Sequence, residues 1–201
     1  MARFRLPDAL LLSLASLALF LYLADDVLEM DWRAFDQEWW VYMKGNAPAA
    51  RAWWISLAGA WIGYGLTLGV MIWLWVRGHR ADFCAFGLVV LGAATLSFLL
   101  KHTFQIPRPV FEGLPMADGF SFPSGHTLYS SCIYGYVGLR LWSWSRPISG
   151  LVLTIPWFVA WSRLELGVHW VSDVLAGLLV GLFWVGLCLH LRPRFLSRFA
   201  A

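Results

Sequence analysis

Three short polar clusters interrupt an otherwise apolar chain, and their residue types could carry out phosphate chemistry. Together they hold three basic side chains, two histidines, one aspartate and a Ser-Gly pair. Their members are Lys101, Arg108, Ser124, Gly125, His126, Arg163, His169 and Asp173. Ionisable residues at membrane depth are energetically expensive and usually functional. The clusters therefore predict an active site and not three separate surface features.

The three cations suit a dianionic oxyanion such as phosphate. An arginine can hold phosphate through two parallel hydrogen bonds, whereas a lysine acts as a point charge. The segment 123–126, Pro-Ser-Gly-His, opens an apolar run. A helix N-terminus there would aim backbone N–H groups at an anion, and a glycine would permit close approach. The predicted phosphate-binding residues are Lys101, Arg108, Ser124, Gly125 and Arg163.

His169 and Asp173 have the spacing of a nucleophile and the carboxylate that orients it. They are four residues apart, which places them on one face if this stretch is helical. The carboxylate could then accept a hydrogen bond from one ring nitrogen and leave the other free to attack. His126 belongs to another cluster and could serve as a separate general acid.

Other polar and small residues have structural explanations. His79 and His190 are expected to be hydrogen-bonding groups without a catalytic role. For Glu165, a solvated loop charge is expected in preference to a contact with a substrate headgroup. Gly177 and Gly181 form a G-x-x-x-G pair, which is typical of close helix packing.

Composition identifies the kind of protein that must position these clusters. Of 201 residues, 60% are hydrophobic and 13% are charged, whereas soluble domains carry about 25% charged residues. This excludes a soluble enzyme and a disordered chain. A net charge of +3 with dispersed basic residues argues against nucleic-acid binding. The three cysteines form no C-x-x-C pair, so neither a disulfide framework nor a thiolate metal site is expected.

Apolar runs predict an all-α fold, a six-transmembrane-helix bundle in one domain over residues 1–201. A spanning helix needs about 20 mostly apolar residues. The runs cover 9–24, 52–76, 83–100, 124–144, 148–162 and 171–191, and the fifth is short and contains a proline. Connection 25–51 is either partly a helix along the membrane interface or a solvated loop with belt tryptophans. Connection 102–122 has too many prolines and glycines to be one regular helix.

The distribution of charge predicts the orientation in the membrane. Six crossings put both termini on one side, and that side receives nine of the 15 Lys and Arg residues. Ten of the 12 acidic residues fall on the other side. Positive residues favour the cytoplasm, so the termini are expected there and the three clusters are expected at the outer, periplasmic face.

The clusters also resemble the motifs of a known family. They read K-x6-R-P over 101–109, P-S-G-H over 123–126 and S-R-x5-H-x3-D over 162–173. These motifs, in this order and spacing, resemble the type 2 phosphatidic-acid phosphatase superfamily, which also holds glucose-6-phosphatases and vanadium haloperoxidases. The hydropathy pattern extends the resemblance to nearly the whole chain.

The resemblance implies a role for each motif residue. His169 would attack phosphorus and form a phosphohistidine, which Asp173 would orient and stabilise. His126 would protonate the leaving oxygen and later help to activate water. The five phosphate-binding residues named above would hold the phosphoryl oxygens. No metal or other cofactor is implied, because the cations would neutralise the charge that Mg²⁺ neutralises elsewhere.

The function that this implies is a lipid phosphatase of a bacterial inner membrane, acting on a lipid phosphate or pyrophosphate at the outer leaflet. Candidate substrates are undecaprenyl pyrophosphate, phosphatidylglycerol phosphate, phosphatidic acid and lipid A. One alternative is a phosphotransferase that uses the same site and a lipid acceptor. Another is a transporter without chemistry, which would place ionisable residues along a path across the bilayer instead of at one face.

Overall fold

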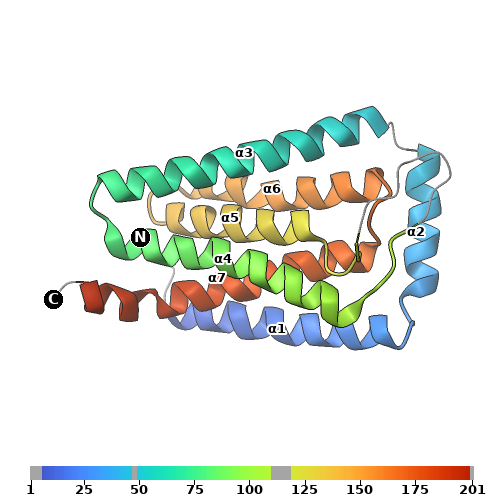
Figure 1. Cartoon of the computed structure of the whole chain (residues 1–201), viewed down its shortest axis with the longest axis horizontal. Helices are drawn as coiled ribbons and strands as arrows, with labels where there is room; N and C mark the ends of the chain where they lie inside the picture. Colours follow the sequence, from blue (N-terminus) through green and yellow to red (C-terminus); the bar gives the residue numbers. More distant parts are fainter. Residues whose placement is uncertain (1–5, 47–48, 110–118, 200–201) are drawn as a thin grey trace.

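A computed structural model describes residues 6–46, 49–109 and 119–199, with side chains described in 8–43, 62–109 and 119–192 (Figure 1). These residues form helices and irregular connections, as the sequence predicts. The helices are α1 (Leu6–Leu28), α2 (Arg33–Asn46), α3 (Ala49–Val76), α4 (Arg80–Phe104), α5 (Gly125–Leu141), α6 (Arg146–Glu165) and α7 (Val171–Phe199).

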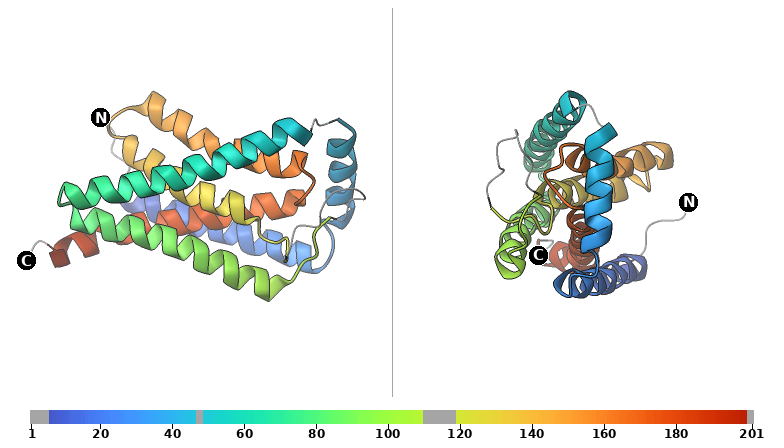
Figure 2. Two further views of the ribbon diagram at one scale, coloured as in Figure 1. Left: turned by 45° about the horizontal axis from the view of Figure 1, so that its top comes forward. Right: turned by 90° about the vertical axis from the view of Figure 1, so that its right-hand side faces the viewer.

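Helix α2 is the one that departs from the bundle direction. It lies across the end of the bundle instead of along it, and the end-on view places it in front of the other helices (Figure 2). The start of α1 and the end of α7 lie together at the opposite end (Figure 1). An even number of helices running along the bundle produces this arrangement. A solvated loop, one of the two alternatives for connection 25–51, is wrong for residues 33–46, which are helical.

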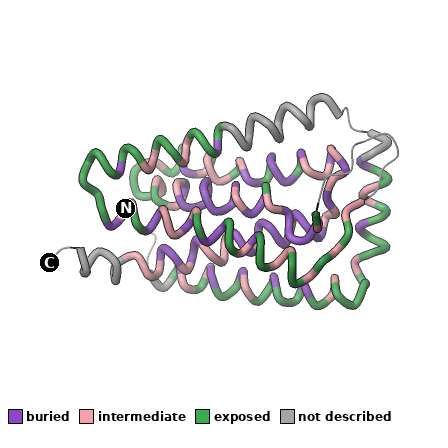
Figure 3. The backbone as a smooth tube through the Cα atoms, in the orientation of Figure 1, coloured by how far each residue is buried: buried purple, intermediate pink, exposed green. Residues whose placement is uncertain are grey.

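Helices α5 and α7 form the centre of the bundle, and buried residues concentrate along them (Figure 3). Their close approach depends on the two glycines of the G-x-x-x-G pair. A Cβ atom at Gly177 would lie 2.8 Å from the Ser124 carbonyl oxygen, and one at Gly181 would lie 2.4 Å from Ser131 Cβ. The predicted packing role of these glycines is confirmed. Since Ser124 precedes α5, this contact also fixes the start of α5 against α7.

The outer faces of the bundle are apolar, which suits a lipid environment. Exposed large side chains include Leu14 of α1, Leu91 of α4 and Phe158 of α6. Among the described residues, three segments are long and apolar enough to cross a membrane: Asp8–Leu28, Arg80–Phe104 and Val171–Arg192. The shorter apolar segment Ile62–Val76 belongs to α3.

Most of the helices are longer than their apolar runs, and α4 and α6 are the two whose extensions bear on the polar clusters. Helix α6 continues through Pro156 to Glu165, because neighbouring helices and side chains can satisfy the backbone groups that a proline frees. Helix α4 extends past residue 100 to Phe104, so that Lys101 lies in its last turn. Between α4 and α5 the described residues are irregular, as predicted for connection 102–122.

Candidate active site

Lys101 is held at the point where α4 ends and the chain turns back. Gln105, with a φ of 51°, adopts a left-handed conformation that terminates the helix. The returning chain is fastened by a hydrogen bond from the Ser121 N–H to the Ile106 carbonyl (2.8 Å). The Lys101 ammonium donates to the carbonyl oxygens of Phe120 (2.5 Å) and Ser121 (3.3 Å). Its charge is therefore fixed directly before the Pro-Ser-Gly-His segment.

The second cluster begins α5, as the sequence predicts. Ser124 is the extended residue before the helix, and its N–H donates to the backbone carbonyl of Asp173 (2.9 Å). The Ser124 hydroxyl is buried and accepts a hydrogen bond from Thr127 Oγ1 (3.1 Å). A Cβ atom at Gly125 would lie 3.2 Å from Ser97 Oγ of α4, which is tighter than an ordinary contact. The absence of a side chain at Gly125 therefore favours the close approach of α5 to α4.

His169 and Asp173 are in contact, although not for the reason that their spacing suggested. His169 lies in the connection before α7 and is not helical. Its Nδ1 is 3.0 Å from Asp173 Oδ2, and the same oxygen accepts the Trp170 N–H (2.9 Å). Asp173 thus satisfies an N–H at the start of α7 and orients the imidazole with one carboxylate oxygen.

Arg108 connects the first cluster to the third. One guanidinium nitrogen, Nη1, donates to the Val168 carbonyl (3.0 Å) and lies 3.2 Å from His169 Nε2. An ionised carboxylate can only accept hydrogen bonds, whereas a guanidinium can only donate them. This network assigns the proton to Nδ1, facing Asp173, and the lone pair to Nε2, facing Arg108. Nε2 is therefore the nitrogen that carries the lone pair, and Arg108 donates to it in this structure.

Burial and charge keep the His169 imidazole neutral. Its exposed fraction is 2%, and that of Asp173 is 0%. Burial, followed by the positive charges of Arg163 and Arg108, holds the pKa of His169 well below its ordinary value. A neutral imidazole retains the lone pair that a nucleophile needs.

Arg163 and His126 complete the set of predicted residues near this centre. Arg163, half-buried in the last turn of α6, lies within electrostatic reach of Lys101, His126 and His169. The structure therefore brings all eight predicted residues to the end of the bundle that α2 crosses.

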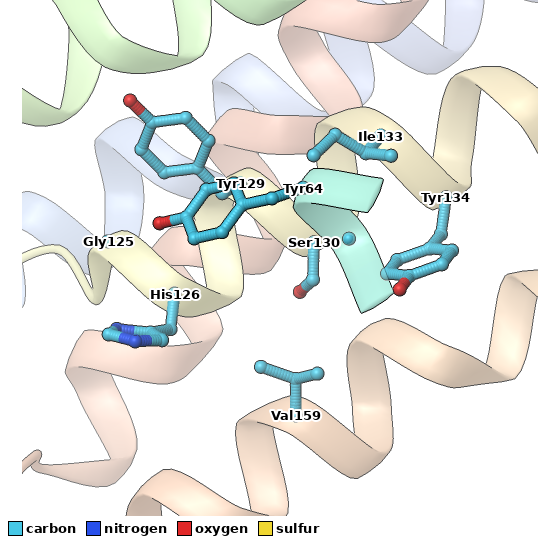
Figure 4. A pocket seen from close by; sticks show the side chains of 9 residues that line it. Tyr64, Gly125, His126, Tyr129, Ser130, Ile133, Tyr134 and Val159 are labelled. Atoms are coloured by element: carbon cyan, nitrogen blue, oxygen red, sulfur yellow. The ribbon is translucent and has the colours of Figure 1, made fainter. Parts of the chain in front are cut away.

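His126 borders an apolar pocket of about 170 Å³. The pocket lies between α3, α5 and α6 and is lined largely by aromatic and aliphatic side chains. Figure 4 shows the His126 ring at one end and Tyr134 at the other, with Val159 along one side. An amphiphile could place its polar group beside His126 and an apolar segment in this pocket.

Sequence reasoning missed two buried carboxylates near the site. Glu165 is 4% exposed and accepts a hydrogen bond from Trp161 Nε1 (2.8 Å), so the expected solvated loop charge is wrong. Asp36 of α2 is 6% exposed and bonds to Ser172 at the start of α7. The only signal for Asp36 was its place in connection 25–51, for which a helix along the membrane interface was one of the two predictions. In the part of the chain that the structure describes, His, Cys, Asp and Glu form no group of three or more able to hold a metal ion.

A neutral, buried imidazole beside fixed cations, in a bundle with apolar outer faces, is suited to phosphoryl transfer at a membrane. Residues 82–197, more than half of the chain, match the family model described as the PAP2 superfamily. The chain belongs to this superfamily, which confirms the resemblance seen in its motifs.

Curated relatives carry phosphatase names. A protein of Escherichia coli K12, named "Putative undecaprenyl-diphosphatase YbjG", is 32% identical over 67% of this chain and 72% of its own length. Phosphatidylglycerophosphatase B of Bacillus subtilis is 35% identical over 43% of this chain and 46% of its own. An undecaprenyl-diphosphatase of Sulfolobus acidocaldarius is 36% identical over 46% and 44%. The protein is thus a phosphatase of the PAP2 family.

Solved structures share the fold. A crystal structure of a transmembrane PAP2-type phosphatidylglycerolphosphate phosphatase from Bacillus subtilis superposes with a TM-score of 0.80, at 23% identity, covering 90% of this chain and 96% of the other. LpxE of Aquifex aeolicus gives a TM-score of 0.61, at 21% identity, covering 77% and 94%. The helical bundle is therefore that of a PAP2 membrane phosphatase.

Proposed function

We propose that this protein removes phosphate from a membrane lipid phosphate or pyrophosphate through a covalent phosphohistidine at His169. The observation that supports this most strongly is the chain of contacts from Asp173 to His169 Nδ1 and from His169 Nε2 to Arg108. It leaves Nε2 with a lone pair, and it places a phosphate-binding type of side chain beside that lone pair.

In the first step, His169 Nε2 bonds to phosphorus while the bond from phosphorus to the leaving oxygen breaks. The leaving oxygen takes the electron pair of that bond and a proton from His126. Asp173 stabilises the positive charge that develops on the imidazole. In the second step, water attacks phosphorus and gives a proton to His126. The phosphorus–nitrogen bond breaks, and its electron pair returns to Nε2.

The phosphoryl oxygens would be held by Lys101, Arg108, Arg163, Ser124 and the Gly125 N–H. The placement of Gly125 as the first residue of α5 supports its part, because N–H groups in the first turn of a helix have no acceptor within the helix. The cations would stabilise charge on the transferring phosphoryl group without a metal ion.

The apolar pocket beside His126 supports an amphiphilic substrate, because the apolar part of a lipid is attached through the leaving oxygen that His126 would protonate. The names of the relatives favour undecaprenyl pyrophosphate or phosphatidylglycerol phosphate as substrate. Phosphatidic acid and lipid A are the other candidates. Assays with each purified lipid phosphate, presented in detergent or vesicles, would identify the preferred one.

We further propose that the protein crosses the bacterial inner membrane six times as one domain, with its site facing the periplasm. A reporter fused after Ala201 is then expected to report the cytoplasm, and one inserted beside Gly113 is expected to report the periplasm. The reason is the excess of Lys and Arg on the side of the termini. The reverse pattern of reporter activity would contradict the orientation and the outer-leaflet substrate.

Metal independence is a separate expectation. Phosphate release from the preferred lipid should continue in excess EDTA, because Lys101, Arg108 and Arg163 supply the positive charge. Orthovanadate should inhibit, because it mimics five-coordinate phosphorus and can bond to His169. The measurement is phosphate release by the purified protein with and without each compound. Loss of activity on chelation that is restored by Mg²⁺ would refute this mechanism.

A further inference from the structure

The connection that carries His169 is fastened by α2 on both sides of the histidine. Two residues before it, the Gly167 carbonyl accepts a hydrogen bond from Trp40 Nε1 (3.1 Å). Three residues after it, Ser172 donates twice to Asp36, from its N–H to Oδ1 (3.0 Å) and from its hydroxyl to Oδ2 (2.5 Å). The two α2 residues are one helical turn apart and therefore share a face.

Each attachment meets a backbone group at a place where a helix ends or begins. Gly167 has a φ of 66° and follows the last turn of α6, where a glycine accommodates the left-handed conformation. Ser172 lies in the first turn of α7, where N–H groups have no acceptor within the helix and a negative charge is stabilising. Asp36 therefore caps α7 from a different helix, directly beside Asp173.

Helix α2 also packs against His169. The space between them is a cavity of only about 10 Å³. It is lined by His169, Leu164 and Val171 and, from α2, by Asp36, Trp39, Trp40 and Met43. A gap this small holds no more than about one water molecule. The imidazole therefore has little room to turn away from the site on the α2 side.

We propose that Asp36 and Trp40 are positioning residues that hold the backbone on either side of His169, so that Nε2 stays directed at the phosphoryl group. This rests on the proposed role of His169 as nucleophile. Neither residue touches the reacting atoms. Both act on the connection that carries His169. A nucleophile displaced by about 1 Å can lose about 10²-fold in rate.

The asparagine variant separates hydrogen bonding from charge at position 36. Burial raises the pKa of Asp36 to about 6, so the carboxylate is mostly ionised at neutral pH. In Asp36→Asn, the amide oxygen can accept the Ser172 N–H, and the amide nitrogen can donate to the Ser172 hydroxyl. Both attachments to α7 are kept, whereas Asp36→Ala removes both.

The test compares these variants in single-turnover release of p-nitrophenolate from p-nitrophenyl phosphate. Asp36→Ala should slow phosphohistidine formation by about 10- to 100-fold, with little change in KM. Asp36→Asn should retain most of the wild-type rate. Trp40→Phe, which lacks the indole donor, should be slowed by a smaller factor. Glu38→Gln is the matched control, since Glu38 is an exposed acid on the same helix, and it should behave as wild type.

A second readout separates positioning from simple loss of folded protein. Binding of orthovanadate at saturation counts competent sites, so a positioning defect lowers the rate constant per site and leaves the number of sites unchanged. Fewer sites with a wild-type rate constant per site would overturn the proposal. Equal loss in Asp36→Asn and Asp36→Ala would also contradict it, because hydrogen bonding would then not be the cause.

Hydrogen exchange tests the attachment without relying on catalysis. Amides in peptides covering residues 166–173 should exchange faster in Asp36→Ala than in Glu38→Gln, while peptides from the middle of α5 remain unchanged. If the wild-type protein released no phosphate, the proposed function would fail. Hydrogen exchange would then still test whether Asp36 holds the connection that carries His169. If Asp36→Ala matched the wild type in both rate and exchange, this inference alone would fail.

Discussion

Replacing His169 with alanine is expected to abolish release of the leaving group from every phosphate substrate. The proposed route requires a bond from Nε2 to phosphorus, and alanine has no atom that can form it. The loss should therefore not depend on the leaving group. Release from a lipid monophosphate and from p-nitrophenyl phosphate should both fall to background.

His126→Ala is expected to behave differently, because a general acid matters most for a poor leaving group. General acid catalysis typically contributes about 10²–10⁴-fold. The variant should be severely impaired on a lipid monophosphate, whose leaving alcohol needs a proton. On p-nitrophenyl phosphate, its rate of phosphohistidine formation should be much closer to that of the wild type, because p-nitrophenolate is a stable anion that leaves without a proton.

The measurement for both histidines is single-turnover release of the leaving group. Steady-state rates would also depend on the later hydrolysis of the phosphohistidine, which His126 is also proposed to assist. The opposite result would be a rate of release that recovers on p-nitrophenyl phosphate in His169→Ala but not in His126→Ala. It would mean that the two roles are exchanged.

Asp173→Asn is expected to slow phosphohistidine formation by about 10²–10³-fold, a typical effect of removing one preorganised electrostatic partner. The amide oxygen can still accept from His169 Nδ1 and from the Trp170 N–H, as Asp173 Oδ2 does. The geometry is then kept, and the variant lacks mainly the negative charge that stabilises the developing imidazolium. Single-turnover release of p-nitrophenolate measures the effect.

A matched control lies at the far end of the bundle. Asp82 is partly buried and paired with Arg192, with Asp82 Oδ1 2.5 Å from Nη2. Asp82→Asn also removes a paired carboxylate, but away from the site, and it should keep the wild-type rate per competent site. If Asp173→Asn stayed within a few-fold of Asp82→Asn, charge stabilisation by Asp173 would be ruled out as a major contribution.

The polar clusters were predictable because they stand out against an apolar background. Lys101, His126 and His169 belong to segments that the hydropathy pattern places at one end of the bundle. The contact between His169 and Asp173 was also predictable, although its backbone is not the expected helix. A spacing of four residues allows contact both along a helix and across its first turn, where Asp173 folds back to the Trp170 N–H.

The role of α2 could not be predicted from local pattern. Asp36 and Ser172 are 136 residues apart in the sequence, and no sequence pattern near either residue predicts their contact. Glu165 was expected to be a solvated loop charge, because the predicted apolar run ends at residue 162. Its burial depends on the length of α6 and on the packing of Trp161, which only the tertiary structure determines.

The measurement that tests the central claim most directly is rapid quenching of the enzyme during turnover, followed by peptide mapping under alkaline conditions that preserve phosphohistidine. The account predicts that phosphate is found on His169, that it forms as fast as the leaving group is released, and that it is absent from His169→Ala. Release of the leaving group in a burst with no phosphate on the protein, or with phosphate on a residue other than His169, would contradict it.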